Sequence, residues 1–241
     1  MKNRKKRGQW AGVCLLALAI AAGWGWGRQR ALAALPAAGR VVVLDAGHGG
    51  WDPGRVGAGA DEKDVNLAIT RRVQEYLEAA GAVVLLTRNA DEALAKGKTD
   101  DLAGRAALAR EGEVFVSIHQ NSYPSPGVKG AQTFYPAGDE AGKALATCIQ
   151  VQLVAEVDPQ NHRQPKENGS YYLFQAVSVP AVIVECGFLS NPEEAGRLSD
   201  PDYQSRVAWA VYRGILDYFE QTGAESGAKR TGILEYFKGK D

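Results

Sequence analysis

The segment VVVLDAGHGGWDPG, residues 41–54, joins an apolar, β-branched run to a loop that holds four glycines and a histidine. Such a run predicts a buried strand, and glycines at this density predict a tight turn after it. His48 therefore stands just past the end of a predicted strand. The loop has neither GxGxxG nor GxxxxGK[ST], the spacings typical of phosphate-binding loops, so a metal site is the better interpretation.

Outward from this segment, apolar runs alternate with helical patterns. This alternation predicts a single α/β domain with a mostly parallel or mixed twisted sheet and helices on both faces. We expect strands at 40–45, 82–87, 113–118 and 180–185, an edge strand at 130–136, and helices at 64–81, 99–112, 139–157 and about 202–221. Asp64 and Thr99 are the expected helix starts, and Gly81 the expected helix stop. The domain then spans 40–221, followed by a polar C-terminal tail at 222–241.

The first 33 residues have the composition of an export segment. Five cations at positions 2–7 precede the apolar run WAGVCLLALAIAAGWGWG. This order is typical of a secretory signal peptide or an N-terminal membrane anchor. Small residues near Ala33 offer a cleavage site, and the apolar run is long enough for a single span if it is retained. Both outcomes place the domain outside the cytoplasmic membrane, secreted or membrane-tethered.

The charge balance makes nucleic acid an improbable partner. Residues 1–33 hold seven basic and no acidic residues, which leaves 21 basic against 28 acidic residues and a net charge of −7 in the rest. A nucleic-acid-binding domain needs a basic surface instead. The rest of the chain holds two cysteines, Cys148 and Cys186, which we expect to be free thiols.

Three polar side chains follow buried strands at the same predicted edge of the sheet. His48 and His119 lie just past the ends of predicted buried strands, and Glu185 closes another. The carboxyl ends of parallel strands meet at one edge, where α/β proteins bind ligands. A carboxylate after four or five core residues needs compensation, because an unpaired buried charge is costly. Two histidines and a carboxylate form an open catalytic zinc set with room for a water.

The spacing does not by itself decide which loop residue near His48 is the third protein ligand. The candidates are Asp52, Asp61, Glu62 and Asp64. Asp64 is better used as the helix cap, and Asp52 before Pro53 suits a turn.

Five segments occur in an order that resembles a known enzyme family. The segments are DAGHGGWDPG, EKDVNLAI, SIHQN, GAQTFYP and VECGFLSN. Together they resemble the zinc-dependent N-acetylmuramoyl-L-alanine amidases of bacterial cell walls, and most of all the sporulation- and germination-specific members. The resemblance covers about residues 40–221.

The resemblance implies a division of roles within the site. It implies that His48, Glu62 and His119 hold Zn²⁺ and that Glu185 is the catalytic carboxylate. The implied reaction is hydrolysis of the amide between N-acetylmuramic acid and L-alanine in peptidoglycan, in spore cortex maturation or germination. An activator protein is a possible partner, as is the membrane through an uncleaved N-terminus. Gln120 departs from the family's smaller residue beside the second histidine, which puts access at the rim of the metal in question.

Three further polar residues are candidates for substrate binding. Arg88 and Arg105 could steer stem-peptide carboxylates, although ion pairs that hold loops to the sheet explain both arginines more simply. Asn121 could contact substrate or fix the loop that carries His119.

Two other functions fit the same residues. A non-catalytic peptidoglycan-binding module would keep the fold, but it is expected to lose at least one of the four polar residues, and all four are present. A zinc carboxypeptidase or endopeptidase would cleave stem peptides at another bond.

Overall fold

The computed structural model describes the backbone of residues 36–57 and 60–238, and the side chains of residues 36–57 and 61–223. The predicted export segment at 1–33 lies outside these ranges. Within them, no helix combines the length and the apolar character that crossing a bilayer requires.

A six-stranded mixed sheet organises the domain, in the order β4-β1-β5-β8-β6-β7. The pairs of β1 with β4, β1 with β5 and β5 with β8 are parallel, whereas β6 runs antiparallel to β8. The strands are β1 (Val41–Ala46), β4 (Val83–Leu86), β5 (Val114–Asn121), β6 (Gln132–Pro136), β7 (Lys166–Asn168) and β8 (Ala181–Phe188). A separate two-stranded ribbon joins β2 (Val56–Gly57) and β3 (Ala60–Asp61). The fold class predicted from sequence is confirmed.

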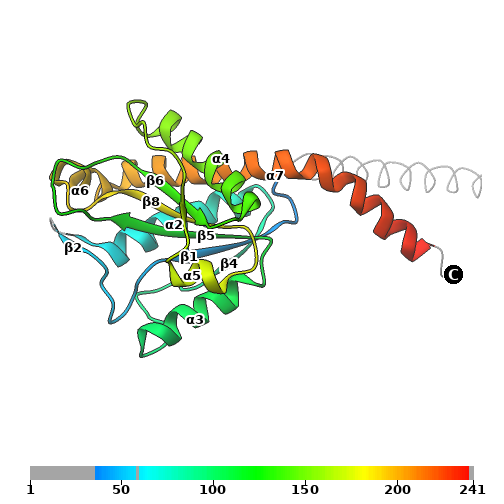
Figure 1. Cartoon of the computed structure of the whole chain (residues 1–241), viewed down its shortest axis with the longest axis horizontal. Coiled ribbons are helices and arrows are strands. Elements are labelled where there is room, and N and C mark those ends of the chain that lie inside the picture. The colour runs from blue at the N-terminus through cyan, green and yellow to red at the C-terminus, as the bar shows by residue number, and fades with distance from the viewer. Residues whose placement is uncertain (1–35, 58–59, 239–241) are drawn as a thin grey trace, which may run out of the picture.

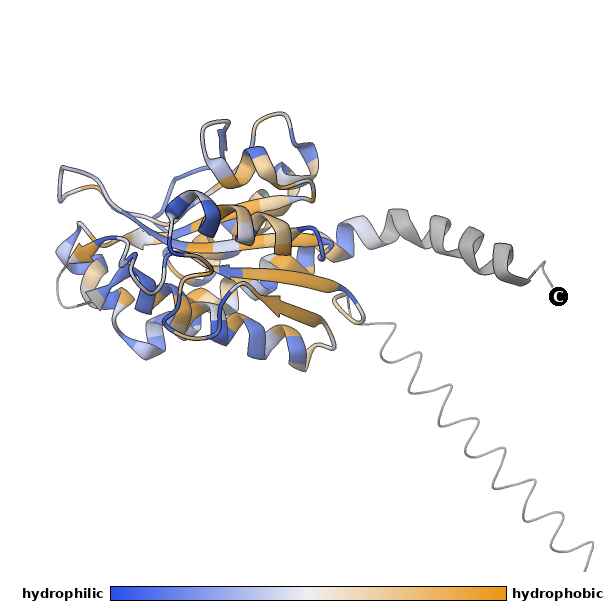
Figure 2. Cartoon of the chain, turned by 90° about the horizontal axis from the view of Figure 1, so that it is seen from below, coloured by the Kyte–Doolittle hydropathy of each residue, from blue (hydrophilic) through white to orange (hydrophobic). Residues whose placement is uncertain are grey.

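Helices cover both faces of the sheet (Figure 1). One face packs against α2 (Glu62–Ala79), α4 (Glu140–Glu156) and α7 (Pro201–Lys238), and the other against α3 (Lys98–Ala109) and α5 (Tyr172–Ala176). The short helix α6 (Pro192–Leu198) follows β8. Apolar residues concentrate on the central strands (Figure 2), which is expected when both faces of parallel strands are covered.

The helical periodicity of α2 positions the site. Val65, Ile69, Val73 and Leu77 are buried on one face, as their spacing predicts. The helix ends before Gly81, whose positive φ of 85° suits the stop predicted there.

Two predicted helix starts were wrong. Helix α2 begins at Glu62, and Asp64 lies inside its first turn. The early start is stabilised by loop carbonyls rather than by a capping side chain, since the amides of Glu62 and Lys63 donate to the carbonyls of Arg55 and Pro53. Helix α3 likewise begins at Lys98 instead of Thr99, after Gly97.

The predicted edge strand is an inner strand. Phe134–Pro136 of β6 pair with Lys166–Asn168 of β7, which forms the actual edge of the sheet. The sequence Lys-Glu-Asn of β7 has no apolar alternation, so its pattern gave no strand signal. Beyond the domain boundary that the sequence predicts at residue 221, α7 continues as a helix to Lys238.

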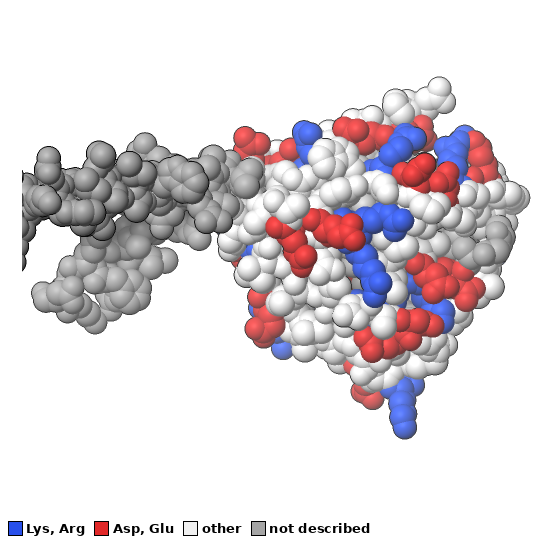
Figure 3. Space-filling view, turned by 180° about the vertical axis from the view of Figure 1, so that it is seen from behind, with Lys and Arg blue, Asp and Glu red and all other residues white. Residues whose placement is uncertain are grey.

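The face of the molecule opposite the view of Figure 1 carries acidic and basic side chains in a mixture rather than in a single-sign patch (Figure 3). Cys148 and Cys186 are buried free thiols, as predicted.

Candidate functional site

The loop after β1 holds His48 in an uncommon backbone conformation. Its φ of 63° is the one positive value at a non-glycine residue in the described part of the chain. Such a conformation persists where the surroundings determine it fully. Here the amide of Gly47 donates to the carbonyl of Ile118, and Gly49 and Asp52 exchange two backbone hydrogen bonds of 2.9 and 3.1 Å. The tight turn predicted from the glycines therefore aims the imidazole of His48.

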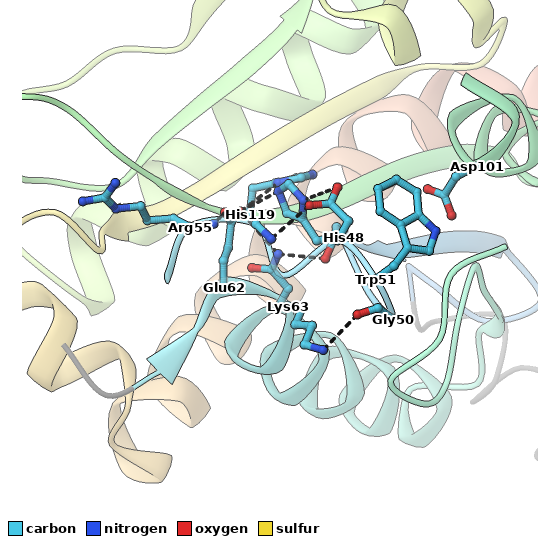
Figure 4. A network of polar contacts seen from close by, with 12 residues as sticks. His48, Gly50, Trp51, Arg55, Glu62, Lys63, Asp101 and His119 are labelled. Carbon is cyan, nitrogen blue, oxygen red and sulfur yellow. Dashed lines mark hydrogen bonds and ion pairs between the residues drawn. The ribbon is translucent and has the colours of Figure 1, made fainter. Parts of the chain in front are cut away.

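Three side chains converge at the carboxyl ends of β1 and β5 (Figure 4). The Oε1 atom of Glu62 lies 3.2 Å from Nε2 of His48 and 3.0 Å from Nδ1 of His119. One donor atom from each of the three residues lies within 4.8 Å of the other two. Two imidazoles and a carboxylate at this separation can hold a transition metal ion.

Two glycines leave room for this convergence. A Cβ at Gly47 would lie 2.2 Å from the ring of His119, and one at Gly54 would lie 2.6 Å from Oε2 of Glu62. Any side chain at either position would displace a donor group, so the glycine-rich loop is required by close approach as well as by its turns.

Glu62 stays ionised at neutral pH despite being buried. Burial alone would raise its pKa, but hydrogen bonding and charge from His119 and His48 outweigh burial and hold the pKa well below its usual range. Its Oε2 atom accepts the amide of Arg55 at 2.8 Å, and its Oε1 atom accepts the amide of Gln120 at 3.1 Å. The carboxylate is thus fixed with its charge available to a cation.

Asp52 supports His48 from the other side of the ring. Its Oδ2 lies 2.9 Å from Nδ1 of His48, and its Oδ1 accepts the amide of Gly54 at 3.1 Å. Burial raises the pKa of Asp52, while the contacts with His48 and Gly54, and the charge of Lys98, lower it below the ordinary value. A carboxylate at Nδ1 favours the tautomer that leaves Nε2 free for a metal.

Glu185 faces the same space from β8. It pairs in register with His119 of β5, and both residues lie inside their strands, which extend beyond the predicted strand ends. Its Oε2 atom is buried without a hydrogen-bond partner among the described residues. Burial raises the pKa of Glu185 to about 7, an effect that the charge of Glu62 strengthens and those of His119 and His48 oppose. Such a carboxyl can both take and give a proton near neutral pH.

A buried charge network lies beneath the histidines. Asp45 is fully buried, accepts the hydroxyls of Thr87 and Ser117, and pairs with Arg105 at 2.6 Å. Arg105 also pairs with Asp101 at 2.6 Å and donates to the carbonyl of His48 at 2.7 Å. Asp45 was not among the residues predicted from sequence, although it follows an apolar run at the end of a strand, the same pattern that identified Glu185.

The three residues suggested for substrate binding lie in different settings. Arg88 and Arg105 are each 2% exposed, and Arg88 donates to four backbone carbonyl groups, among them those of Ala46 and Gly47. This geometry favours the loop-holding alternative for both arginines. The side-chain oxygen of Asn121 accepts the amide of Ser122, and the backbone carbonyl of Asn121 accepts the amide of Leu189.

His48, His119 and Glu185 open into a pocket that residues of α3 and α5 also line. Lys98 at the start of α3 lines the same pocket. The remaining lining residues are Asp45, Gly47, Asp52, Asp101, Leu102, Arg105, Tyr171, Tyr172, Leu173 and Ile183. The candidate catalytic groups therefore lie in a space that a substrate can enter.

The chain is similar in sequence and in fold to known proteins. Residues 42–217 match the family described as N-acetylmuramoyl-L-alanine amidase. The chain is 41% identical over 200 residues to the germination-specific N-acetylmuramoyl-L-alanine amidase of Bacillus subtilis, covering 79% of this chain and 84% of that protein.

Two solved structures are similar as well. The CwlD amidase from Clostridioides difficile, solved in complex with the GerS lipoprotein, is 40% identical with a TM-score of 0.72, covering 75% of this chain and 98% of that one. The amidase AmiC2 of Nostoc punctiforme is 35% identical with a TM-score of 0.67, covering 75% of this chain and 97% of that one.

Proposed function

This chain belongs to the N-acetylmuramoyl-L-alanine amidase family and is therefore a hydrolase of peptidoglycan, and we propose that His48, Glu62 and His119 hold its zinc while Glu185 carries the proton. The observation that supports this division is the contrast between the carboxylates. Glu62 contacts both histidines, whereas Glu185 has an unpartnered oxygen and lines the same pocket.

The residues present fit a zinc ion. Two neutral imidazoles with an ionised carboxylate are a usual three-ligand set for catalytic zinc, and Asp52 provides the outer carboxylate that such a histidine commonly contacts. When bound, zinc supplies Lewis-acid polarisation of the scissile carbonyl and acidifies water.

Glu185 performs the proton transfers in this proposal. As a carboxylate it accepts a proton from the attacking water, and as the acid it returns that proton to the nitrogen of L-alanine while the carbon–nitrogen bond breaks. An amine leaves poorly unless it is protonated, so one carboxyl that serves both steps is sufficient. Burial favours the protonated form of Glu185, which helps the returned proton to stay on it until the nitrogen takes it.

The substrate of the family places the enzyme outside the cytoplasmic membrane. We further propose that residues 1–33 export the domain, either as a cleaved signal peptide or as a retained anchor. The name of the germination-specific B. subtilis relative supports a role in germination, for which we propose the spore cortex as the substrate. The lipoprotein in the C. difficile structure supports a partner protein for this chain too.

Product analysis tests the proposed reaction. Purified peptidoglycan incubated with the full chain and zinc, with a candidate lipoprotein partner added in parallel, is examined by mass spectrometry. We expect stem peptides with a free L-alanine amino terminus, and glycan whose muramic acid carries a free lactyl carboxyl. Release of single terminal residues would instead identify a carboxypeptidase, and binding without any release would identify a binding module.

A further inference from the structure

The side chain of one lysine that lines the pocket makes neither a hydrogen bond nor an ion pair with the described residues. The two arginines first considered for substrate carboxylates are buried and donate to groups of the protein itself. Lys63 donates to Asp91 at 2.8 Å and to the carbonyl of Gly50, and the side chain of Arg55 points away from the histidines in Figure 4. Lys98, by contrast, is exposed, lines the pocket and has no ion pair within the described residues.

Lys98 is not explained by the stability of α3. It is the first residue of that helix, where the helix dipole favours acidic rather than basic side chains. Asp100 and Asp101 occupy the same first turn and supply the favourable charge. The charge of Lys98 acts on Asp52 through space, but no carboxylate of the described residues pairs with it, so its ammonium group is available to a ligand of opposite charge.

The chemistry of the substrate indicates which part Lys98 meets. In peptidoglycan the lactyl carboxyl of muramic acid is consumed by the scissile amide, so the glycan beside that bond is neutral. The stem peptide carries free carboxylates, the first of them on the D-glutamate that follows L-alanine. The pocket that Glu185 lines is also lined by Lys98 and by a largely apolar set of side chains, Leu102, Tyr171 and Leu173.

Resting on the proposed function, we propose that this pocket is the stem-peptide subsite and that Lys98 binds the α-carboxylate of its second residue. The apolar wall contacts the alanine methyl group and the aliphatic part of the glutamate. Lys98 is thereby a specificity-determining residue, which favours substrates with a free carboxylate over substrates amidated at that position.

Two muropeptides that differ only in this group, D-glutamate against D-isoglutamine, test the proposal with the full zinc-loaded chain. We expect kcat/KM of the parent to favour the free acid by about 5- to 10-fold, the size of a partly shielded charge contact. Lys98→Met should bring the ratio near one, and Lys98→Glu should invert it. Lys96→Met is the matched control, because Lys96 is exposed in the loop just before α3 but does not line the pocket.

A parent ratio near one, or a Lys98→Met variant that keeps the parent ratio, would overturn the proposal. Calorimetry separates it from the proposed reaction. The two free stem peptides, acid and amide, are titrated into parent and Lys98→Met chains. If the chain does not cleave the bond between muramic acid and L-alanine, the proposed reaction is refuted. The preference in binding for the D-glutamate peptide over the D-isoglutamine peptide then still tests the role of Lys98.

Discussion

The layer formed by α2, α4 and α7 contacts the sheet through apolar side chains, whereas the loop of residues 47–55 is fixed by buried charges and close backbone approaches. In the layer, Leu145, Ile149 and Ile215 are fully buried. In the loop, the carbonyl of His48 accepts from Arg105, and Glu62 accepts the amide of Arg55. Apolar packing stabilises the first region, whereas hydrogen bonds and ion pairs hold the polar groups of the second in place.

The largest expected effect concerns the charge network beneath the loop. Arg105→Met leaves Asp45 buried without its partner, so we expect the free energy of unfolding to fall by about 3–5 kcal/mol, measured by urea denaturation. We expect Leu145→Ala in the apolar layer to lower the free energy of unfolding by a similar amount. The double variant Asp45→Asn/Arg105→Met should recover part of the loss. A cost below about 1 kcal/mol for Arg105→Met would show that the network does not support the loop.

A pair of glycines sharpens the contrast between the regions. A Cβ at Gly214 of α7 would lie 2.4 Å from the Cα of Ile149, so Gly214→Ala should force α4 and α7 apart and cost about 3 kcal/mol of stability. Once folded, this variant should bind zinc like the parent. Gly47→Ala should instead weaken zinc binding more than it lowers stability, because the added methyl displaces His119. We expect roughly 100-fold weaker zinc binding. Zinc titration and urea denaturation of both variants test this contrast. Equal losses of stability and of zinc affinity in the two variants would contradict the distinction between the packed layer and the loop.

A smaller effect is expected at Asp52. Asp52→Asn replaces the carboxylate at Nδ1 of His48 with an amide, which no longer favours the productive tautomer. Zinc affinity, measured by chelator competition, should fall by about 10- to 100-fold. Asp91→Asn is the control, because Asp91 accepts the amide of Gly50 but does not contact the histidines. If both variants bind zinc equally, Asp52 does not position His48.

The two regions also differ in how well the sequence predicts them. Helices α2 and α4 follow a local pattern of apolar residues, so their existence and buried faces could be predicted from the chain alone. The start of α2 could not, because carbonyls of the preceding loop, rather than a local cap, satisfy its first amides. The strand β7 could not either, since its residues carry no apolar pattern.

Within the site, the sequence predicted the edge of the sheet but not every role. His48, His119 and Glu185 follow apolar runs, which marked them as neighbours before the structure was known. The choice of Glu62 among the loop candidates needed the family resemblance, since its position depends on a contact with His119, 57 positions away. The burial of Arg88 and Arg105 also depends on such distant contacts, which a sequence pattern does not reveal.

The central claim is that three side chains hold zinc while Glu185 moves the proton, and one paired measurement tests it most directly. Zinc content and peptidoglycan hydrolysis are determined for the parent, Glu185→Gln and His119→Ala. We predict that Glu185→Gln keeps about one zinc per chain while its turnover falls by about 10²- to 10⁴-fold, the usual contribution of a general base. His119→Ala should lose most of its zinc. Equal zinc loss in both variants would make Glu185 a ligand, and an active Glu185→Gln would contradict the account.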